Sequence, residues 1–229
     1  MKVKLLSRTT DALRTAYIAA RTCYSEQTPY AMDFEIFNPQ QMQELIDKVY
    51  QSGHLSIFEH INFTFAIEHI SRACSHQLVR HRHCSFSQQS QRYVDLQSPV
   101  FLEPQTILHD READSIYNNF LINVDEVYKK LRTLGIAPED ARCVLPNATT
   151  TNMVVTMNCR ELMHICSLRL CTRAQQEIRE LVNKMKEVVV NECEWLKPYL
   201  VPQCEVNGFC KENKCCGRKP KLKELIKEK

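Results

Sequence analysis

The stretch from Arg80 to Tyr93 is dense in side chains that bind anions or form hydrogen bonds. Three arginines and two histidines lie among seven hydroxyl or amide side chains, counting Tyr93. Planar guanidinium groups match phosphate oxygens in pairs, and amides and hydroxyls match the edge of a pyrimidine and a ribose. The segment is therefore either a solvated polar loop or a pocket for a nucleotide.

The elements before this segment favour the pocket. Apolar and polar residues alternate from 61 to 69, which predicts a strand with one buried face. Ser71 then caps a predicted short helix that reaches toward Arg80. A segment that leaves a helix anchored in this way is a poor candidate for free solvent.

Glycine is too scarce for the usual phosphate-binding loops. The chain of 229 residues has four glycines, and no two of them lie at a phosphate-loop spacing. A G-x-G-x-x-G turn and a Walker loop are therefore excluded. Side chains or helix N-termini must hold any phosphate.

The remaining patterns predict a single α+β domain with a mainly antiparallel sheet and packed helices. Asn38 and Pro39 begin one predicted helix, and Asn158 with Glu161 and Thr172 with Gln175 make two capping boxes. Further helices are predicted at 10–22, 110–134 and after 138, and further strands at 92–96 and 149–157.

Charge and hydropathy exclude several classes of protein. The formal charge is +3, but eight Lys or Arg against three Glu follow residue 210, so the body is close to neutral. A broad nucleic-acid-binding face is not expected. No apolar run could span a membrane or act as a secretory signal. We therefore expect a cytoplasmic protein whose twelve cysteines are mostly reduced.

The polar segment also resembles a known signature. Arg80-His81-Arg82, followed after seven residues by Ser90, is similar to the motif of the flavin-dependent thymidylate synthases, the ThyX family. Further similar segments are Ala19–Ser25, Gly53–His54, Phe58–His60, Phe63–Phe65, Ala141–Pro146, Asn158–Leu162 and Leu168–Arg169. The resemblance covers residues 1–200, the expected catalytic domain, and leaves 201–229 as a Cys- and Lys-rich tail.

This resemblance implies an activity, a fold and ligands. The activity is the reductive methylation of dUMP to dTMP, with methylenetetrahydrofolate as carbon donor, NADPH as reductant and FAD as hydride carrier. The fold is the thymidylate synthase-complementing fold, and the family forms homotetramers with shared active sites.

The resemblance also assigns residues one by one. Those matching dUMP contacts are Gln77, Arg80, Gln88, Gln89, Ser90, Gln91, Arg92, Arg142 and Arg169. Those matching FAD contacts are Ser56, Arg80, His81, Arg82, Gln88, Asn158, Arg160 and His164. Arg169 matches the arginine that polarises the uracil ring, and is the expected catalytic residue. Gln88 stands where many members have Glu, so it keeps an acceptor and loses a charge.

Metal binding is a rival interpretation of the histidines and thiols. Six of eight histidines lie between His54 and His83, but a strand and a helix do not converge them on one face, and His69 continues the buried phase of the strand. Cys204, Cys210, Cys215 and Cys216 could bind zinc, or belong to a partly ordered basic tail with exposed thiols. We expect a partly ordered basic tail with exposed thiols, and no bound metal.

Two other functions use the same residues. A classical thymidylate synthase attacks uracil with a cysteine beside a proline, but none of the nine prolines is followed by Cys. A non-catalytic RNA- or nucleotide-binding module could use the arginine-rich loop with Phe86 and Tyr93 as stacking surfaces. The module predicts steep salt dependence and no colour, whereas the enzyme predicts a yellow protein.

Overall fold

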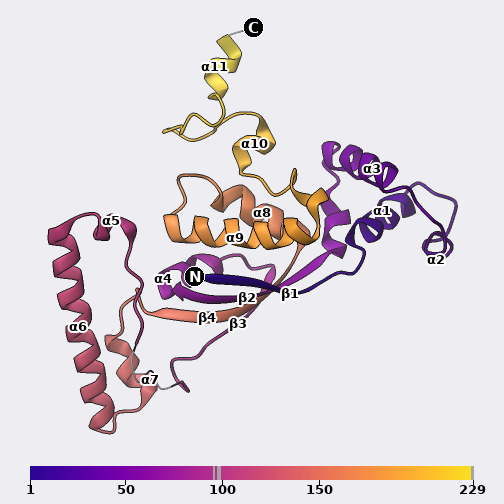
Figure 1. Ribbon diagram of the computed structural model, residues 1–229. Helices are drawn as coiled ribbons and strands as arrows, with labels where there is room; N and C mark the ends of the chain where they lie inside the picture. Colours follow the sequence, from indigo (N-terminus) through magenta and orange to yellow (C-terminus); the bar gives the residue numbers. More distant parts are fainter. Residues whose placement is uncertain (95, 97–98, 228–229) are drawn as a thin grey trace. The chain divides into compact units, whose positions relative to one another are not determined.

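The computed structural model describes residues 1–94, 96 and 99–227 (Figure 1). Its contacts divide the chain into two compact units. Unit 1 comprises Met1–Lys2, Ala66–Arg80 and Phe86–Val154, and unit 2 comprises Val3–Phe65, His81–Ser85 and Val155–Lys229. The predicted catalytic segment therefore contributes to both units, since Arg80 ends one stretch of unit 1 and His81 begins a stretch of unit 2.

A four-stranded sheet runs in the order β1-β2-β4-β3. The strands are β1 (Lys2–Arg8), β2 (Asn62–Ser71), β3 (Cys84–Gln88) and β4 (Thr150–Asn158). β2 and β4 are antiparallel, because Ile61 pairs with Cys159 at one end and Ala73 with Asn147 at the other. With helices packed in both units, the predicted α+β fold with a mainly antiparallel sheet is confirmed.

Helices make up most of the remaining regular structure. They are α1 (Ala12–Thr22), α2 (Pro29–Met32), α3 (Pro39–Gln51), α4 (Arg72–Leu78), α5 (Gln105–Leu108), α6 (Arg111–Thr133), α7 (Pro138–Ala141), α8 (Cys159–Arg169), α9 (Gln176–Glu192), α10 (Gln203–Asn207) and α11 (Leu222–Lys227). Short 3-10 helices are η1 (Leu55–His60), η2 (Arg142–Val144) and η3 (Glu194–Leu196). None of the described helices is long and apolar enough to cross a membrane.

The predicted caps of three helices are confirmed. The side chain of Asn38 accepts the Gln40 N–H of α3 at 2.8 Å. Ser71 accepts the Cys74 N–H of α4 at 3.0 Å, and Asn158 accepts the Glu161 N–H of α8 at 2.9 Å. Each cap satisfies a backbone donor that the helix itself leaves unpaired. The helices that flank the candidate site thus begin where the sequence predicts.

Three local predictions are wrong. Thr172 lies in a turn, its side chain hydrogen-bonded to Cys216, and α9 begins only after Gln175, without a side-chain cap. His69 has φ +57° and is exposed, because the backbone of β2 changes direction there and Ile70 becomes the buried residue. The strand predicted at 92–96 is a turn from Arg92 to Tyr93, and its residue 95 lies outside the described residues.

Each unit has an apolar core of its own. In unit 2, α8 and α9 lie side by side (Figure 1) and bury Leu162, Ile165 and Met185. In unit 1, α6 packs on α5 and α7 and buries Leu121 and Tyr128. Burying a large apolar side chain stabilises a fold by about 1.5–3 kcal/mol. Burial of these apolar side chains holds the helices in place, and with them the polar site residues at the helix ends.

Candidate active site

Unit 1 gathers most of the residues predicted for dUMP. Gln77 lies in α4 and Arg80 just after it, Gln88 ends β3, and Gln89 to Arg92 form the turn that follows. Arg142 begins η2, more than 50 residues further along the chain. Segments distant in sequence therefore meet within one compact unit.

Two arginines of this group contact the same residue. The Arg92 Nε lies 3.0 Å from a carboxylate oxygen of Glu139, and the Arg142 Nε donates to the backbone oxygen of Glu139 at 3.1 Å. Burial lowers the pKa of Arg72, and the positive charge of Arg142 lowers it further. Arg92 thus contacts the Glu139 carboxylate, Arg142 contacts the Glu139 backbone, and the charge of Arg142 acts on Arg72, an arrangement that favours an anionic ligand.

The glutamines and Ser90 are held by specific partners. Gln88 donates from Nε2 to the hydroxyls of Ser75 at 3.0 Å and Thr151 at 3.2 Å. The amide of Gln89 accepts from Asn152 at 2.8 Å. Since Nε2 of Gln88 is engaged, its Oε1 is the atom that remains for a ligand.

Two further contacts define the turn. The hydroxyl of Ser90 accepts the Arg92 N–H at 3.2 Å. The Gln91 Nε2 is buried and has no hydrogen-bond partner among the described residues. A buried amide of this kind is costly unless a ligand supplies the missing acceptor. Unit 1 therefore has the positive charge of its arginines and an unpaired hydrogen-bond donor, both of which suit a nucleotide.

Unit 2 contains the remaining predicted residues around His81. His81 is buried, with its Nδ1 3.4 Å from an oxygen of Glu161 and its Nε2 accepting from the Arg169 Nε at 3.2 Å. The ring of His164 lies 5.8 Å from the His81 ring. Burial lowers the pKa of His81 to about 4, with further lowering from Arg169 and His164. The imidazole is therefore neutral near pH 7.

Beside this group is a hollow of about 640 Å³ within unit 2. Three predicted FAD residues, Asn158, Arg160 and His164, line it from the first turns of α8, and Arg160 forms an ion pair with Glu59 of η1. Its other walls come from η1 and α10 and include Tyr199. Such a volume is typical of small-molecule sites.

Five of the eight predicted FAD residues do not line this hollow. Arg80 and Gln88 belong to unit 1, and His81 is buried next to Glu161, which does line the hollow. Ser56 is exposed in η1, next to the lining residue Leu55, and Arg82 is exposed after His81. The hollow nevertheless suits a flavin dinucleotide, since it combines apolar walls with an arginine and the buried amide of Asn207, whose Nδ2 has no partner among the described residues. These residues therefore fit the cofactor.

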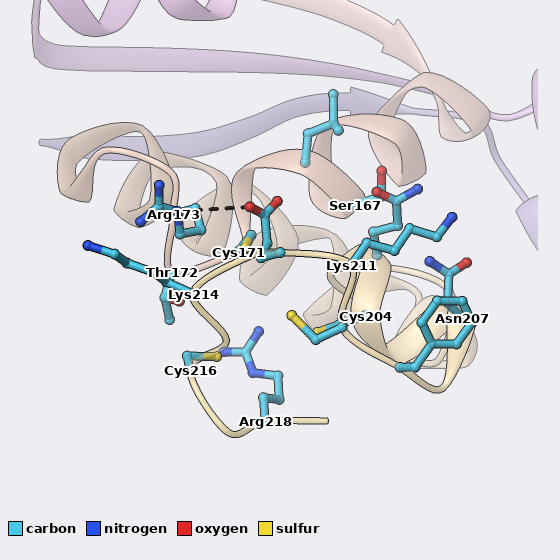
Figure 2. A pocket seen from close by; sticks show the side chains of 15 residues that line it. Ser167, Cys171, Thr172, Arg173, Cys204, Asn207, Lys211, Lys214, Cys216 and Arg218 are labelled. Carbon is cyan, nitrogen blue, oxygen red and sulfur yellow. Dashed lines mark ion pairs between the residues drawn. The ribbon is translucent and has the colours of Figure 1, made fainter. Parts of the chain in front are cut away.

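The tail packs against the end of α8 (Figure 2). Arg218 donates to the backbone oxygen of Leu170 at 3.3 Å, and Arg173 approaches Glu212 at 3.9 Å. Together with Cys171, Cys204 and Cys216 these segments enclose a small hollow of about 70 Å³. The tail is thus attached to the helix that carries Arg169.

The thiols of this tail differ in exposure. Cys216 is exposed, but Cys210 is buried and its N–H donates to Pro220 at 2.8 Å, so the expectation of exposed thiols is wrong there. Within the described part of the chain, no three His, Cys, Asp or Glu side chains are arranged to hold a metal ion.

Sequence reasoning missed the carboxylates that organise both groups. The sequence predicts neither carboxylate as a site residue. Glu139 follows Pro138 in a short predicted helix, and Glu161 is predicted only as part of a capping box. β1 and β3 were also not predicted, although Cys84–Gln88 alternates in burial. Pairing partners distant in sequence leave no local signal, so only the fold reveals these contacts.

Comparison with known proteins finds a matching family model and full-length relatives. Residues 4–194 match the family model "Thymidylate synthase complementing protein". A flavin-dependent thymidylate synthase of Geobacter sulfurreducens is 39% identical over 231 residues, covering 100% of this chain and 99% of the relative. One from Pyrococcus abyssi is 40% identical and covers 93% of this chain and 90% of the relative.

A solved structure extends the comparison to the fold. The UMP/dUMP methylase PolB from Streptomyces cacaoi, bound with 5-Br dUMP, superimposes with a TM-score of 0.70 at 25% identity, covering 86% of this chain and 94% of that one. With a family model that spans most of the chain and full-length relatives near 40% identity, the chain belongs to the family of flavin-dependent thymidylate synthases.

Proposed function

We propose that the two groups of polar residues perform different parts of this family's reaction. The enzyme methylates dUMP reductively to dTMP, with FAD as its cofactor. Residues of unit 1 hold the nucleotide, and residues of unit 2 hold the cofactor and activate the uracil ring. Methylenetetrahydrofolate donates the carbon and NADPH the reducing equivalents.

The nucleotide phosphate is the ligand of Arg92 and Arg142, with Arg80 and Gln77 beside them. A doubly charged phosphate needs several fixed donors, and a hydrogen bond to a charged group contributes about 1.5–3 kcal/mol. Gln88, Gln89, Ser90 and Gln91 contact the sugar and base through amide and hydroxyl groups. The observation that carries this assignment is the contact of both Arg92 and Arg142 with Glu139, together with the unpaired amide of Gln91 in the same unit.

Arg169 is the catalytic residue of the proposal. Hydride addition to the uracil ring places negative charge on its N3 and O4 side. A guanidinium at this position acts like an oxyanion hole, where the loss of one donor lowers the rate by about 10²–10³. The hydrogen bond from Arg169 to neutral His81 keeps this guanidinium in a fixed orientation.

FAD is the ligand of His81, Arg82, Ser56, Asn158, Arg160 and His164, and the family resemblance assigns Arg80 and Gln88 to both ligands. When bound, FAD supplies the hydride transfer that none of the twenty side chains can perform. The cationic and imidazole groups of unit 2 offset the negative charge of a dinucleotide and of a reduced ring. The hollow that Arg160 and His164 line supports this assignment.

The assembly and location follow the family. The proposed arrangement has residues 1–200 as the catalytic domain, 201–229 as a tail attached to it, and a homotetramer with shared active sites. The protein is proposed to act in the cytoplasm, since its cysteines are free thiols, as is usual in a reducing compartment. Folate and NADPH are small-molecule partners, and no nucleic acid or membrane is expected to bind.

Absorbance spectroscopy and turnover test the proposal together. The purified protein should be yellow, should bleach with NADPH and should change its spectrum when dUMP is added. Arg169→Ala should keep FAD and lose turnover by about 10²–10³. Arg92→Ala should mainly raise the KM for dUMP, and Arg111→Ala, an exposed arginine of the same unit, should change neither.

Three results would contradict the proposal. Normal turnover of Arg169→Ala would refute the role of Arg169 in ring activation. Unchanged KM of Arg92→Ala would refute the phosphate site. A colourless protein that FAD cannot reconstitute, with steeply salt-dependent RNA binding, would instead support the non-catalytic module.

A further inference from the structure

Glu161 is a buried carboxylate in the wall of the hollow proposed for FAD, and the proposed function assigns it no role. Its side chain is 8% exposed, and it lies in the first turn of α8, where its N–H is capped by Asn158. A glutamate at this helix position usually turns back to the N-cap. Here the carboxylate faces the Nδ1 of His81 at 3.4 Å instead. Glu161 therefore contacts a residue of the candidate active site.

His81 connects the two ends of α8. Glu161 and Arg169 are eight residues apart, so they are separated by about 12 Å along the helix axis. The His81 ring contacts both, with Nδ1 toward Glu161 and Nε2 toward the Arg169 Nε. One imidazole thus joins a carboxylate at the start of the helix to a guanidinium at its end.

The direction of the hydrogen bond from Arg169, with the carboxylate on the other side of the ring, indicates the tautomer of His81. Nε2 accepts from Arg169, which carries donors only, so Nε2 holds no proton. The single proton of the neutral ring is then on Nδ1, where Glu161 can accept it. In the other tautomer, an N–H of the ring would point at an N–H of Arg169 while Nδ1 faced a carboxylate. Both contacts would be repulsive.

We infer that Glu161 is a positioning residue, which holds Arg169 in its catalytic orientation by fixing the tautomer and rotation of His81. This inference rests on the proposed role of Arg169 in activating the uracil ring. It goes beyond that role by naming the carboxylate on which the orientation of the guanidinium depends. Carboxylate–imidazole pairs orient metal ligands and general bases by the same principle.

Three variants separate a loss of Arg169 positioning from the general effect of removing a buried carboxylate. Glu161→Leu should lower kcat per bound FAD by about 10- to 100-fold through misorientation of Arg169, with the KM for dUMP unchanged. Glu161→Gln keeps an oxygen acceptor for Nδ1–H and should restore kcat to within about threefold of wild type. The matched control is Glu177→Leu, which removes another buried carboxylate, on α9, and should leave kcat unchanged.

A double variant tests whether Glu161 acts through Arg169. In the Arg169→Ala background, Glu161→Leu should cause no further loss of kcat, because the group that it positions is already gone. A full additional loss would overturn the inference. If Arg169→Ala lowers turnover but Glu161→Leu does not, this inference fails alone. If Arg169→Ala has normal turnover, the proposed function fails with it.

Nitrogen NMR of histidine-labelled protein gives a readout independent of activity and of ligands. The His81 signals, assigned with His81→Gln, should report a single Nδ1–H tautomer in the wild type and in Glu161→Gln. Glu161→Leu should give a mixture of tautomers. A single unchanged Nδ1–H tautomer in Glu161→Leu would overturn the inference even if that variant were too unstable for kinetics.

Discussion

Replacing Glu139 by Gln should strengthen the binding of dUMP. The Glu139 carboxylate holds the Arg92 guanidinium at 3.0 Å, and the side chains are 49% and 51% exposed. The nucleotide phosphate must take Arg92 away from this carboxylate or share it. Exposed ion pairs contribute about 0.2–1 kcal/mol, so their removal should lower the KM for dUMP by about 1.4- to 5-fold.

The structure also says what should not change. Arg142 contacts the backbone oxygen of Glu139, which the substitution leaves in place. The gain in binding is the same for substrate and transition state, so kcat should stay constant. The gain should shrink at high ionic strength, because salt screens exposed pairs. Steady-state kinetics in dUMP, at low and high salt, measures all three quantities.

Asp140→Asn is the matched control for this experiment. It removes the same charge from the same short helix, α7, without breaking the contact to Arg92. Equal decreases in KM for both variants would mean that net charge, rather than release of Arg92, is responsible. In an Arg92→Ala background, Glu139→Gln should have no effect. A decrease in KM there, or an increase in the wild-type background, would refute the reasoning.

Two further predictions concern Gln88 and His81. Gln88→Glu should retain dUMP turnover and cost about 1 kcal/mol in urea unfolding. The Ser75 hydroxyl donates to the backbone oxygen of Arg72 at 2.9 Å and must turn to donate to the new carboxylate instead. Loss of dUMP binding would contradict this account of Gln88. The pKa of His81 is lowered to about 4 from 6.5, so the unfolded chain binds more protons between these values. The contribution of His81 to the free energy of unfolding should therefore be constant above pH 6.5 and fall by about 3 kcal/mol toward pH 4, at about 1.4 kcal/mol per pKa unit. His81→Gln should lose this component, whereas the exposed His83→Gln should keep it; equal pH profiles in the wild type and in His81→Gln would show that another group is responsible.

Local chemistry explains which elements the sequence predicts. Asn38 and Asn158 are recognisable as caps, because the side chain and the donor that it satisfies lie within three residues of each other. The buried face of β2 is visible in the alternation of its residues up to Ile67. The motif from Arg80 to Ser90 identifies the family because its spacing is long and specific.

The errors arise where distant segments decide the local structure. The Thr172 side chain hydrogen-bonds with Cys216 of the tail instead of capping α9. At His69, the backbone N–H donates to the side chain of Asn152 on β4, and the φ angle of +57° reverses the predicted burial. Neither partner lies near in sequence, so periodicity alone cannot reveal them.

The two missed carboxylates differ in a way that matches the groups they hold. Burial lowers the pKa of Arg72 and the charge of Arg142 lowers it further, so guanidinium groups in this unit are stabilised by an anion when no ligand is bound. Glu139 is half exposed, and a phosphate can replace it at little cost. Glu161 is buried against a neutral imidazole, where breaking the contact would strand a charge away from water. An exchangeable partner therefore suits the arginine that must release and bind substrate. A permanent partner suits the arginine that must keep one orientation through every turnover.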